Sequence, residues 1–184
     1  MTMGPRIKAI PTTYAGVTFR SRLEARYAVF MDAVMINWEY EPERVQLPSG
    51  GTYLPDFKTA DGAYIEVKGA EANLDKPYLI RAASVLGHLS VLGPIPSCRA
   101  GIPGRTVLTS DGDGNIDSVR MWLSWHDYRP VHREQRLTVP PVEGMSPAGW
   151  LSVRPVTERT CRGKCPYDMA RGARFEHGES GAVR

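Results

Sequence analysis

The sequence predicts an α/β fold in which helices flank a mixed central β-sheet. Three patterns lead to this prediction: an amphipathic helix at residues 21–35, a β-hairpin at residues 53–69, and a helix followed by a strand at residues 75–93. The chain has 184 residues, which fits one compact domain with additional segments. We expect an irregular N-terminal arm at residues 1–17, the folded domain at residues 18–139, and a loosely ordered extension rich in Pro, Gly and Arg at residues 140–184.

The helix at residues 21–35 is predicted by apolar side chains that recur at steps of three and four residues, as they do on one face of a helix. These side chains are Leu23, Tyr27, Phe30, Met31 and Val34. The segment that follows is expected to be extended, with prolines at positions 42 and 48 and a Ser-Gly-Gly turn at residues 49–51.

The hairpin at residues 53–69 consists of two short apolar runs joined by a three-residue connection that ends in Gly62. This connection predicts a register, because pairing of Thr59 with Ala63 places Asp56 opposite Glu66. The Cβ atoms of residues in such positions lie about 4.5–5.5 Å apart. The two carboxylates are therefore expected on one face of the hairpin, close to each other.

The second run of the hairpin alternates in the way that strands do. Its apolar side chains, Ile65 and Val67, are expected to pack against a helix, whereas Glu66 and Lys68 share the other face.

The next unit is predicted as a helix that Asp75 caps, with Pro77 in its first turn and Gly87 at its end. Strands at residues 88–93, 105–109 and 118–125 are expected to follow. The segment 111–117, DGDGNID, imitates the start of a calcium loop, but Ile116 stands where that loop needs glycine. We interpret it as a hairpin turn.

The two acids of the hairpin would repel each other unless a proton or a cation lies between them. Hard oxygen ligands suit Mg²⁺, and Mn²⁺ is expected to substitute for it. Such a metal would be bound by Asp56 and Glu66. Lys68 would then stand beside the metal as a positive charge that orients or deprotonates an attacking water.

These residues resemble the signature of the PD-(D/E)xK nuclease superfamily, read here as Pro55-Asp56 followed by Glu66, Val67 and Lys68. The match covers residues 18–92 and includes an upstream helix with a glutamate, Glu24. Its order of elements is similar to that of phage endonucleases that cut branched DNA and of endonuclease subunits of transposition systems. The resemblance implies a restriction-endonuclease-like core and metal-dependent hydrolysis of DNA, with Glu24 as a further catalytic residue and metal ligand.

Each of these residues also has a simpler interpretation. Ser21 and Glu24 match the capping box, in which the glutamate only binds the start of the helix. Asp56, Glu66 and Lys68 could form an exposed hairpin face with one cross-strand ion pair. At the level of function, the alternatives to an endonuclease are a non-catalytic nucleic-acid-binding module and a nuclease subunit that is silent without its partner.

DNA is the expected partner. The net charge of +3 and the sequence pI near 8.8 are compatible with a polyanion. Arg20, Arg22 and Arg26, around the first helix, are candidates for phosphate contacts. A homodimer would suit paired cuts, and a phage-encoded enzyme would act in recombination, repair or genome processing.

The sequence favours a soluble, cytoplasmic protein, located in the bacterial host cytoplasm if it is phage-encoded. The N-terminal residues form no apolar signal segment, and no run approaches the roughly 18–20 apolar residues of a membrane span. Three cysteines argue against a disulfide framework. Cys161 and Cys165 resemble half of a zinc site, but the sequence has no clear second pair, which argues against structural Zn²⁺ there.

Overall fold

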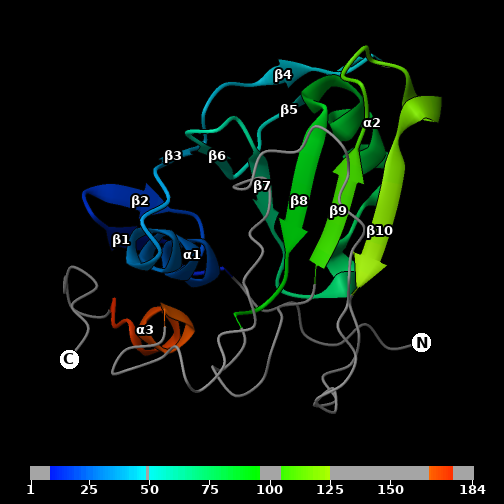
Figure 1. The fold of residues 1–184 in the computed structure, drawn as a ribbon. Coiled ribbons are helices and arrows are strands. Elements are labelled where there is room, and N and C mark those ends of the chain that lie inside the picture. The colour runs from blue at the N-terminus through cyan, green and yellow to red at the C-terminus, as the bar shows by residue number, and fades with distance from the viewer. Residues whose placement is uncertain (1–8, 49, 96–104, 125–165, 176–184) are drawn as a thin grey trace.

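A computed structural model describes residues 9–48, 50–95, 105–124 and 166–175. Its centre is a six-stranded sheet in the order β10-β9-β8-β7-β6-β3, in which only β7 and β8 are parallel neighbours (Figure 1). The strands are β3 (Trp38–Tyr40), β6 (Phe57–Thr59), β7 (Tyr64–Val67), β8 (His88–Leu92), β9 (Arg105–Thr109) and β10 (Arg120–Ser124). The predicted mixed α/β fold, with helices flanking a mixed central sheet, is confirmed.

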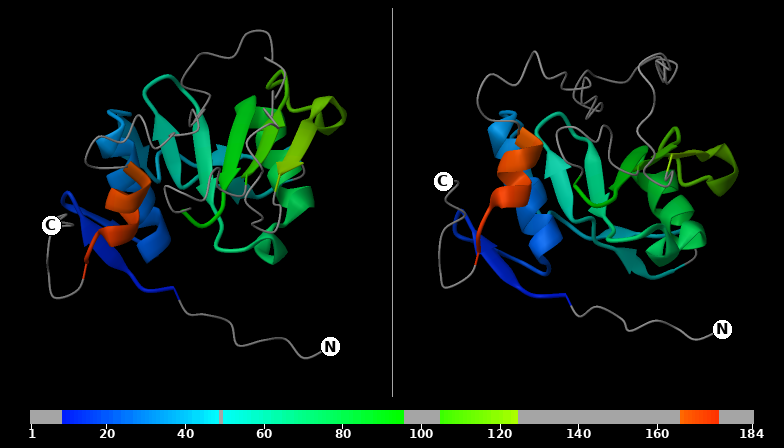
Figure 2. Two further views of the ribbon diagram at one scale, coloured as in Figure 1. Left: turned by 60° about the horizontal axis from the view of Figure 1, so that its bottom comes forward. Right: turned by 90° about the horizontal axis from the view of Figure 1, so that it is seen from below.

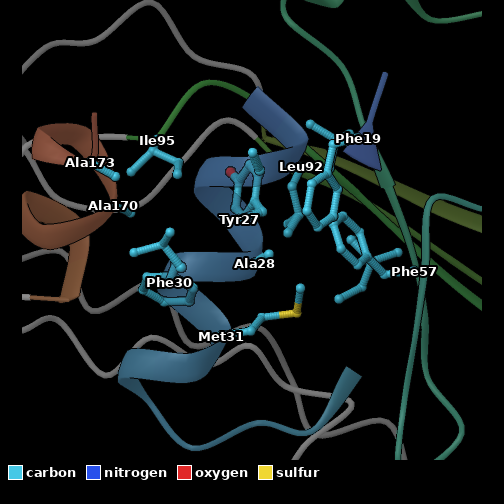
Figure 3. Close-up of a cluster of buried hydrophobic side chains, with 14 of the residues drawn as sticks. Phe19, Tyr27, Ala28, Phe30, Met31, Phe57, Leu92, Ile95, Ala170 and Ala173 are labelled. Atoms are coloured by element: carbon cyan, nitrogen blue, oxygen red, sulfur yellow. The ribbon is translucent and has the colours of Figure 1, made fainter. Parts of the chain in front are cut away.

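The first helix, α1 (Arg22–Ala33), forms where the apolar spacing predicts it. Ser21 caps it, since its Oγ accepts a hydrogen bond from the Glu24 N–H at 3.2 Å. The apolar face of α1 packs on Ile65 and Val67 of β7, as the alternation of that strand predicts. Figure 3 shows this cluster, in which Phe19, Tyr27, Met31 and Phe57 meet.

A short hairpin precedes α1, and its presence corrects the expectation of an irregular arm at residues 1–17 for residues 12–17; residues 1–8 lie outside the described part of the chain. The strands β1 (Thr12–Tyr14) and β2 (Val17–Phe19) pair antiparallel through a two-residue turn. Both turn residues, Ala15 and Gly16, have positive φ angles, 49° and 79°, which is the geometry that matches the twist of paired strands. The Tyr14 hydroxyl donates to Asp32 Oδ2 at 2.7 Å and thereby ties the hairpin to α1.

The helix α3 (Pro166–Gly172) joins the same core, so the expectation of a loosely ordered extension is wrong for residues 166–175. Its Tyr167 ring stacks on Phe30 of α1, with 4.8 Å between ring centroids. Ala170 and Ala173 are also buried, which lets α3 lie closely beside α1 (Figures 2 and 3). Tyr167 and Ala170 are three residues apart, so they lie on one side of the helix and give α3 a small apolar face, although charged residues also occur in the helix.

The opposite face of the sheet is covered by α2 (Lys76–Leu86), which connects the parallel strands β7 and β8. Asp75 caps α2 through the Tyr78 N–H, and the helix ends at Gly87, which has a φ of 73°, as the sequence predicts. The short pair β4 (Val45–Gln46) and β5 (Thr52–Tyr53) packs beside α2. Two 3₁₀ turns complete the description, η1 (Glu71–Asn73) and η2 (Ile116–Ser118).

The β6–β7 hairpin has the predicted register. Phe57 pairs with Ile65 and Lys58 with Tyr64, and the Thr59 N–H donates to the Ala63 carbonyl at 2.9 Å. The segment 111–117 connects the antiparallel strands β9 and β10, which confirms its interpretation as a hairpin turn.

Candidate active site

The two hairpin acids lie where the register places them and are almost completely buried. Asp56 is 2% exposed and Glu66 is 6% exposed. Phe57 pairs with Ile65 in the antiparallel hairpin, so Asp56, which precedes Phe57, stands opposite Glu66, which follows Ile65. The alternative of an exposed, solvated hairpin face is therefore wrong for both acids, because apolar side chains of β5 and α2 cover that side of the sheet.

Asp56 is held by two donors of the chain itself. Its Oδ2 accepts from the Val67 N–H at 2.7 Å, and its Oδ1 accepts from Arg20 Nη2 at 2.5 Å. Burial and the negative charge of Glu66 raise the pKa of Asp56 to about 7, although the Val67 N–H and Arg20 act in the opposite direction. A buried carboxyl in this condition has a strong tendency to bind a proton or a cation.

Glu66 also has two donors. Its Oε2 accepts from the Tyr53 hydroxyl at 2.6 Å, and its Oε1 accepts from Lys68 Nζ. Lys68 lies just after β7, and its N–H continues the ladder to the Leu92 carbonyl at 2.8 Å. The ammonium group is thus fixed beside the acids, as the period of the strand predicts. The pKa of the Tyr53 hydroxyl is raised by burial and by Glu66, so this group remains a hydrogen-bond donor at neutral pH.

The Glu24 side chain binds the residues at the start of α1 and also lies near Asp56. Its Oε1 accepts from the Ser21 hydroxyl at 2.7 Å, and its Oε2 accepts from the Tyr40 hydroxyl at 2.6 Å and the Arg20 N–H at 3.1 Å. The side chain is buried, and its charge contributes to the raised pKa of Asp56. Glu24 therefore binds the start of α1 and lies near the acid pair at the same time, so the two interpretations of this residue do not exclude each other.

Of the three candidate arginines, Arg20 contacts an acid of the site, Asp56. Its Nε contacts Glu41 Oε1 at 2.8 Å while its Nη2 contacts Asp56. Arg22 and Arg26 are half-buried residues of α1, and their contact with DNA stays a prediction. The zinc candidates Cys161 and Cys165 lie outside the described residues.

Sequence reasoning missed Tyr40 and Tyr53 as partners of the acids, and it also missed Glu41 as a partner of Arg20. The signal available for the tyrosines was indirect. Buried carboxylates require hydrogen-bond donors, and Tyr53 stands in a short apolar run just before Asp56, whereas Tyr40 lies between two glutamates. The ion pair of Glu41 with Arg20 depends on how β3 meets the start of α1, which no local pattern reveals.

The acid pair fits a hard divalent cation in its chemistry. Mg²⁺ commonly takes one or two protein carboxylates and completes its shell with water and phosphate oxygens, and Asp56 and Glu66 supply two such groups in a buried setting. Within the described residues, no three His, Cys, Asp or Glu side chains converge on a point that could hold a metal. In the described part of the chain, Glu24 therefore does not form a three-residue metal-binding group with this pair.

Comparisons with known proteins return no match: no family model fits the sequence, and no curated protein or solved structure is significantly similar to it. None of the helices in the described part of the chain has the length and apolarity needed to cross a membrane. The function must therefore be argued from the site itself.

Proposed function

We propose that this chain is a metal-dependent DNA endonuclease with a restriction-endonuclease-like core, similar to the PD-(D/E)xK nucleases. The observation that carries the proposal is the buried, opposed pair of Asp56 and Glu66 with Lys68 fixed beside it. Burying two like charges destabilises a fold, so a chain that places them together is expected to use them to hold a cation.

Hydrolysis of a phosphodiester needs a nucleophile, a place for the phosphate and a stabiliser of charge. Bound between Asp56 and Glu66, Mg²⁺ would supply Lewis acidity and a more acidic water. Lys68 would orient the attacking water and stabilise the negative charge on the phosphoryl oxygens in the transition state. The water oxygen forms the new bond to phosphorus, the bond to one bridging ester oxygen breaks, and the products carry a phosphate monoester and a hydroxyl.

Glu24 and Arg20 support this chemistry from the start of α1. Glu24 fixes the backbone of Arg20 and the hydroxyl of Tyr40, so it sets the position of the guanidinium relative to Asp56. A guanidinium can donate two parallel hydrogen bonds to phosphate oxygens. Because Arg20 contacts Asp56 and is also 56% exposed, we expect it, among the three candidate arginines, to contact the DNA backbone near the acids.

A second candidate function, a non-catalytic nucleic-acid-binding module, is favoured by one observation. Both acids already have a positively charged partner, Arg20 for Asp56 and Lys68 for Glu66. In such a module these ion pairs would only stabilise the fold, and no cation would be needed. The two functions therefore differ in whether a metal binds at all.

The test is incubation of the purified protein with linear, nicked, branched and single-stranded DNA, in Mg²⁺, in Mn²⁺ and in EDTA. We expect cleavage of at least one substrate with either metal and none in EDTA. Asp56→Asn and Glu66→Gln should abolish cleavage. The matched control is Glu39→Gln, which removes the same charge from an exposed residue of β3 and should cut normally. Normal cleavage by either site variant, or no cleavage of any substrate by the wild type, would refute the enzyme.

A further inference from the structure

We propose that Arg20 is an exchangeable counter-ion of the acid pair: its guanidinium neutralises Asp56 until a DNA phosphate binds it and thereby frees Asp56 for a divalent cation. The inference rests on the proposed nuclease function and adds to it an order of binding. It predicts that the free protein holds metal weakly and that DNA prepares the metal site.

The first step of the argument is which oxygens of Asp56 remain for a cation. Oδ2 is fixed by the Val67 N–H, which belongs to the backbone and cannot withdraw without disturbing β7. Oδ1 is occupied by Arg20 Nη2 at 2.5 Å. A divalent cation that approaches Oδ1 therefore meets a positive charge already bound there, and the two compete for the same carboxylate.

The second step concerns freedom of movement. The side chain of Asp56 is 3% exposed, whereas that of Arg20 is 56% exposed. The Arg20 backbone is anchored, because its N–H donates to Glu24 at 3.1 Å and to the Tyr40 hydroxyl at 3.0 Å. The long side chain can therefore turn away from Asp56 toward solvent while its Cα stays in place.

The third step is the role of Glu41. This residue has a φ of 45°, a conformation that residues other than glycine adopt at an energetic cost. Its N–H donates to the Asp56 carbonyl at 2.9 Å, and its carboxylate contacts Arg20 Nε at 2.8 Å. Glu41 thus offers the guanidinium a second carboxylate, which keeps it near the site after it leaves Asp56.

Lys68 is not expected to exchange in this way. Lys68 directly follows β7, two residues after Glu66, and its side chain is 30% exposed, compared with 56% for Arg20, so it has less freedom to turn toward solvent. The exchange is therefore assigned to Arg20 alone. Arg20 acts as a positioning residue, through Asp56, and its effect should appear in metal binding without any turnover.

The experiment is calorimetric titration of the EDTA-stripped full chain with Mn²⁺ in the absence of DNA. Arg20→Gln should bind Mn²⁺ about tenfold more tightly than the wild type, a factor typical of coupling between two sites. Arg120→Gln removes an exposed arginine from β10, at the opposite edge of the sheet, and should bind as the wild type does. Asp56→Asn should abolish binding, which shows that the titrated site is the acid pair.

A second measurement tests the phosphate half of the exchange. In EDTA, Arg20→Gln should bind a short DNA duplex more weakly than the wild type, with a shallower dependence on salt, because one phosphate contact is lost. The same substitution thus raises Mn²⁺ affinity and lowers DNA affinity. Unchanged DNA affinity in this variant would overturn the exchange with phosphate.

Glu41→Gln provides a test that does not depend on the folding of the Arg20 variant. Without Glu41 the guanidinium is left to Asp56, so Mn²⁺ affinity should fall several-fold in the wild-type background and stay constant in the Arg20→Gln background. An equal fall in both backgrounds indicates a general effect of charge and overturns the proposal.

The possible failures are distinguishable. Equal, measurable Mn²⁺ affinities of the wild type and Arg20→Gln would refute the counter-ion role and leave the proposed nuclease intact. Absence of Mn²⁺ binding in the wild type, in Arg20→Gln and in the presence of DNA would refute the metal site, and with it both the inference and the proposed function.

Discussion

Replacing Asp56 by Asn should stabilise the metal-free protein at alkaline pH and leave its stability nearly unchanged in acid. Burial and the charge of Glu66 raise the pKa of Asp56 from 3.8 to about 7. The folded protein therefore keeps a proton in a pH range where the unfolded chain has already lost it, so the free energy of unfolding falls as the pH rises from about 4 to about 7. One pKa unit corresponds to about 1.4 kcal/mol, so ionised Asp56 destabilises the folded state by about 4 kcal/mol above that range.

Asn has nearly the same shape as Asp and still accepts the Val67 N–H, but it never ionises. Urea denaturation in EDTA, followed by circular dichroism at several pH values, should show the two proteins equally stable near pH 4 and the variant more stable near pH 8, by up to about 4 kcal/mol. Glu39→Gln, at an exposed position, should show no such divergence. If the difference in unfolding free energy between Asp56→Asn and the wild type does not grow with pH, or if the variant is less stable near pH 8, the idea that burial and repulsion raise the pKa of Asp56 is contradicted.

Three further predictions concern single residues. Glu24→Gln keeps acceptor and donor groups at the start of α1 but removes the charge: if the residue acts in catalysis, cleavage should fall strongly with little change in melting temperature, whereas near-normal cleavage would leave only the cap. Lys68→Met should reduce the cleavage rate by at least about 10²–10³-fold while DNA affinity in Ca²⁺ stays within a few-fold of wild type; retained cleavage would exclude the role in the transition state. Tyr167→Ala removes the ring that stacks on Phe30 and should lower the free energy of unfolding by about 3–5 kcal/mol, measured by urea denaturation; a change below about 1 kcal/mol would show that α3 contributes little to the core.

The hairpin of the acids was predictable because two local signals agree there. Gly62, with a φ of 86°, suits the turn, and strict alternation allows only one register in which Ile65 and Val67 face the core. The same holds for α2, whose first and last residues follow from Asp75 and Gly87. Where local chemistry alone determines the structure, the sequence is sufficient.

The N-terminal hairpin and α3 were missed for different physical reasons. The strands β1 and β2 have three residues each, which is too short for periodicity to stand out, and Ala15 in the turn carries none of the usual preference for a positive φ. In α3 the buried residues are Tyr167 and Ala170, with Ala173 just after the helix, and the stability of α3 comes from packing on α1 rather than from its own composition.

The electrostatics of the candidate site were predictable only in part. The repulsion of Asp56 and Glu66 follows from the register of the hairpin. The contact of Arg20 with Asp56, in contrast, joins a residue that precedes α1 in the chain to one that comes well after it. Because such a contact depends on the packing of β2 and β6 against the start of the helix, no spacing rule contains it. The sequence therefore indicated the acids and their chemistry, while the groups that neutralise them emerged from tertiary structure.

The order of the elements along the chain has a consequence for synthesis on the ribosome. Every side chain of the candidate site precedes β8, whereas α3 is the last of the described elements. Domains begin to fold as they emerge, so the acid pair can assemble while Phe30 still lacks the Tyr167 ring that stacks on it. We expect nascent chains stalled before Pro166 to bind chaperones through this uncovered aromatic surface, and release of the chaperone to coincide with the emergence of α3. Equal chaperone binding by stalled chains of either length would show that α1 is protected in another way.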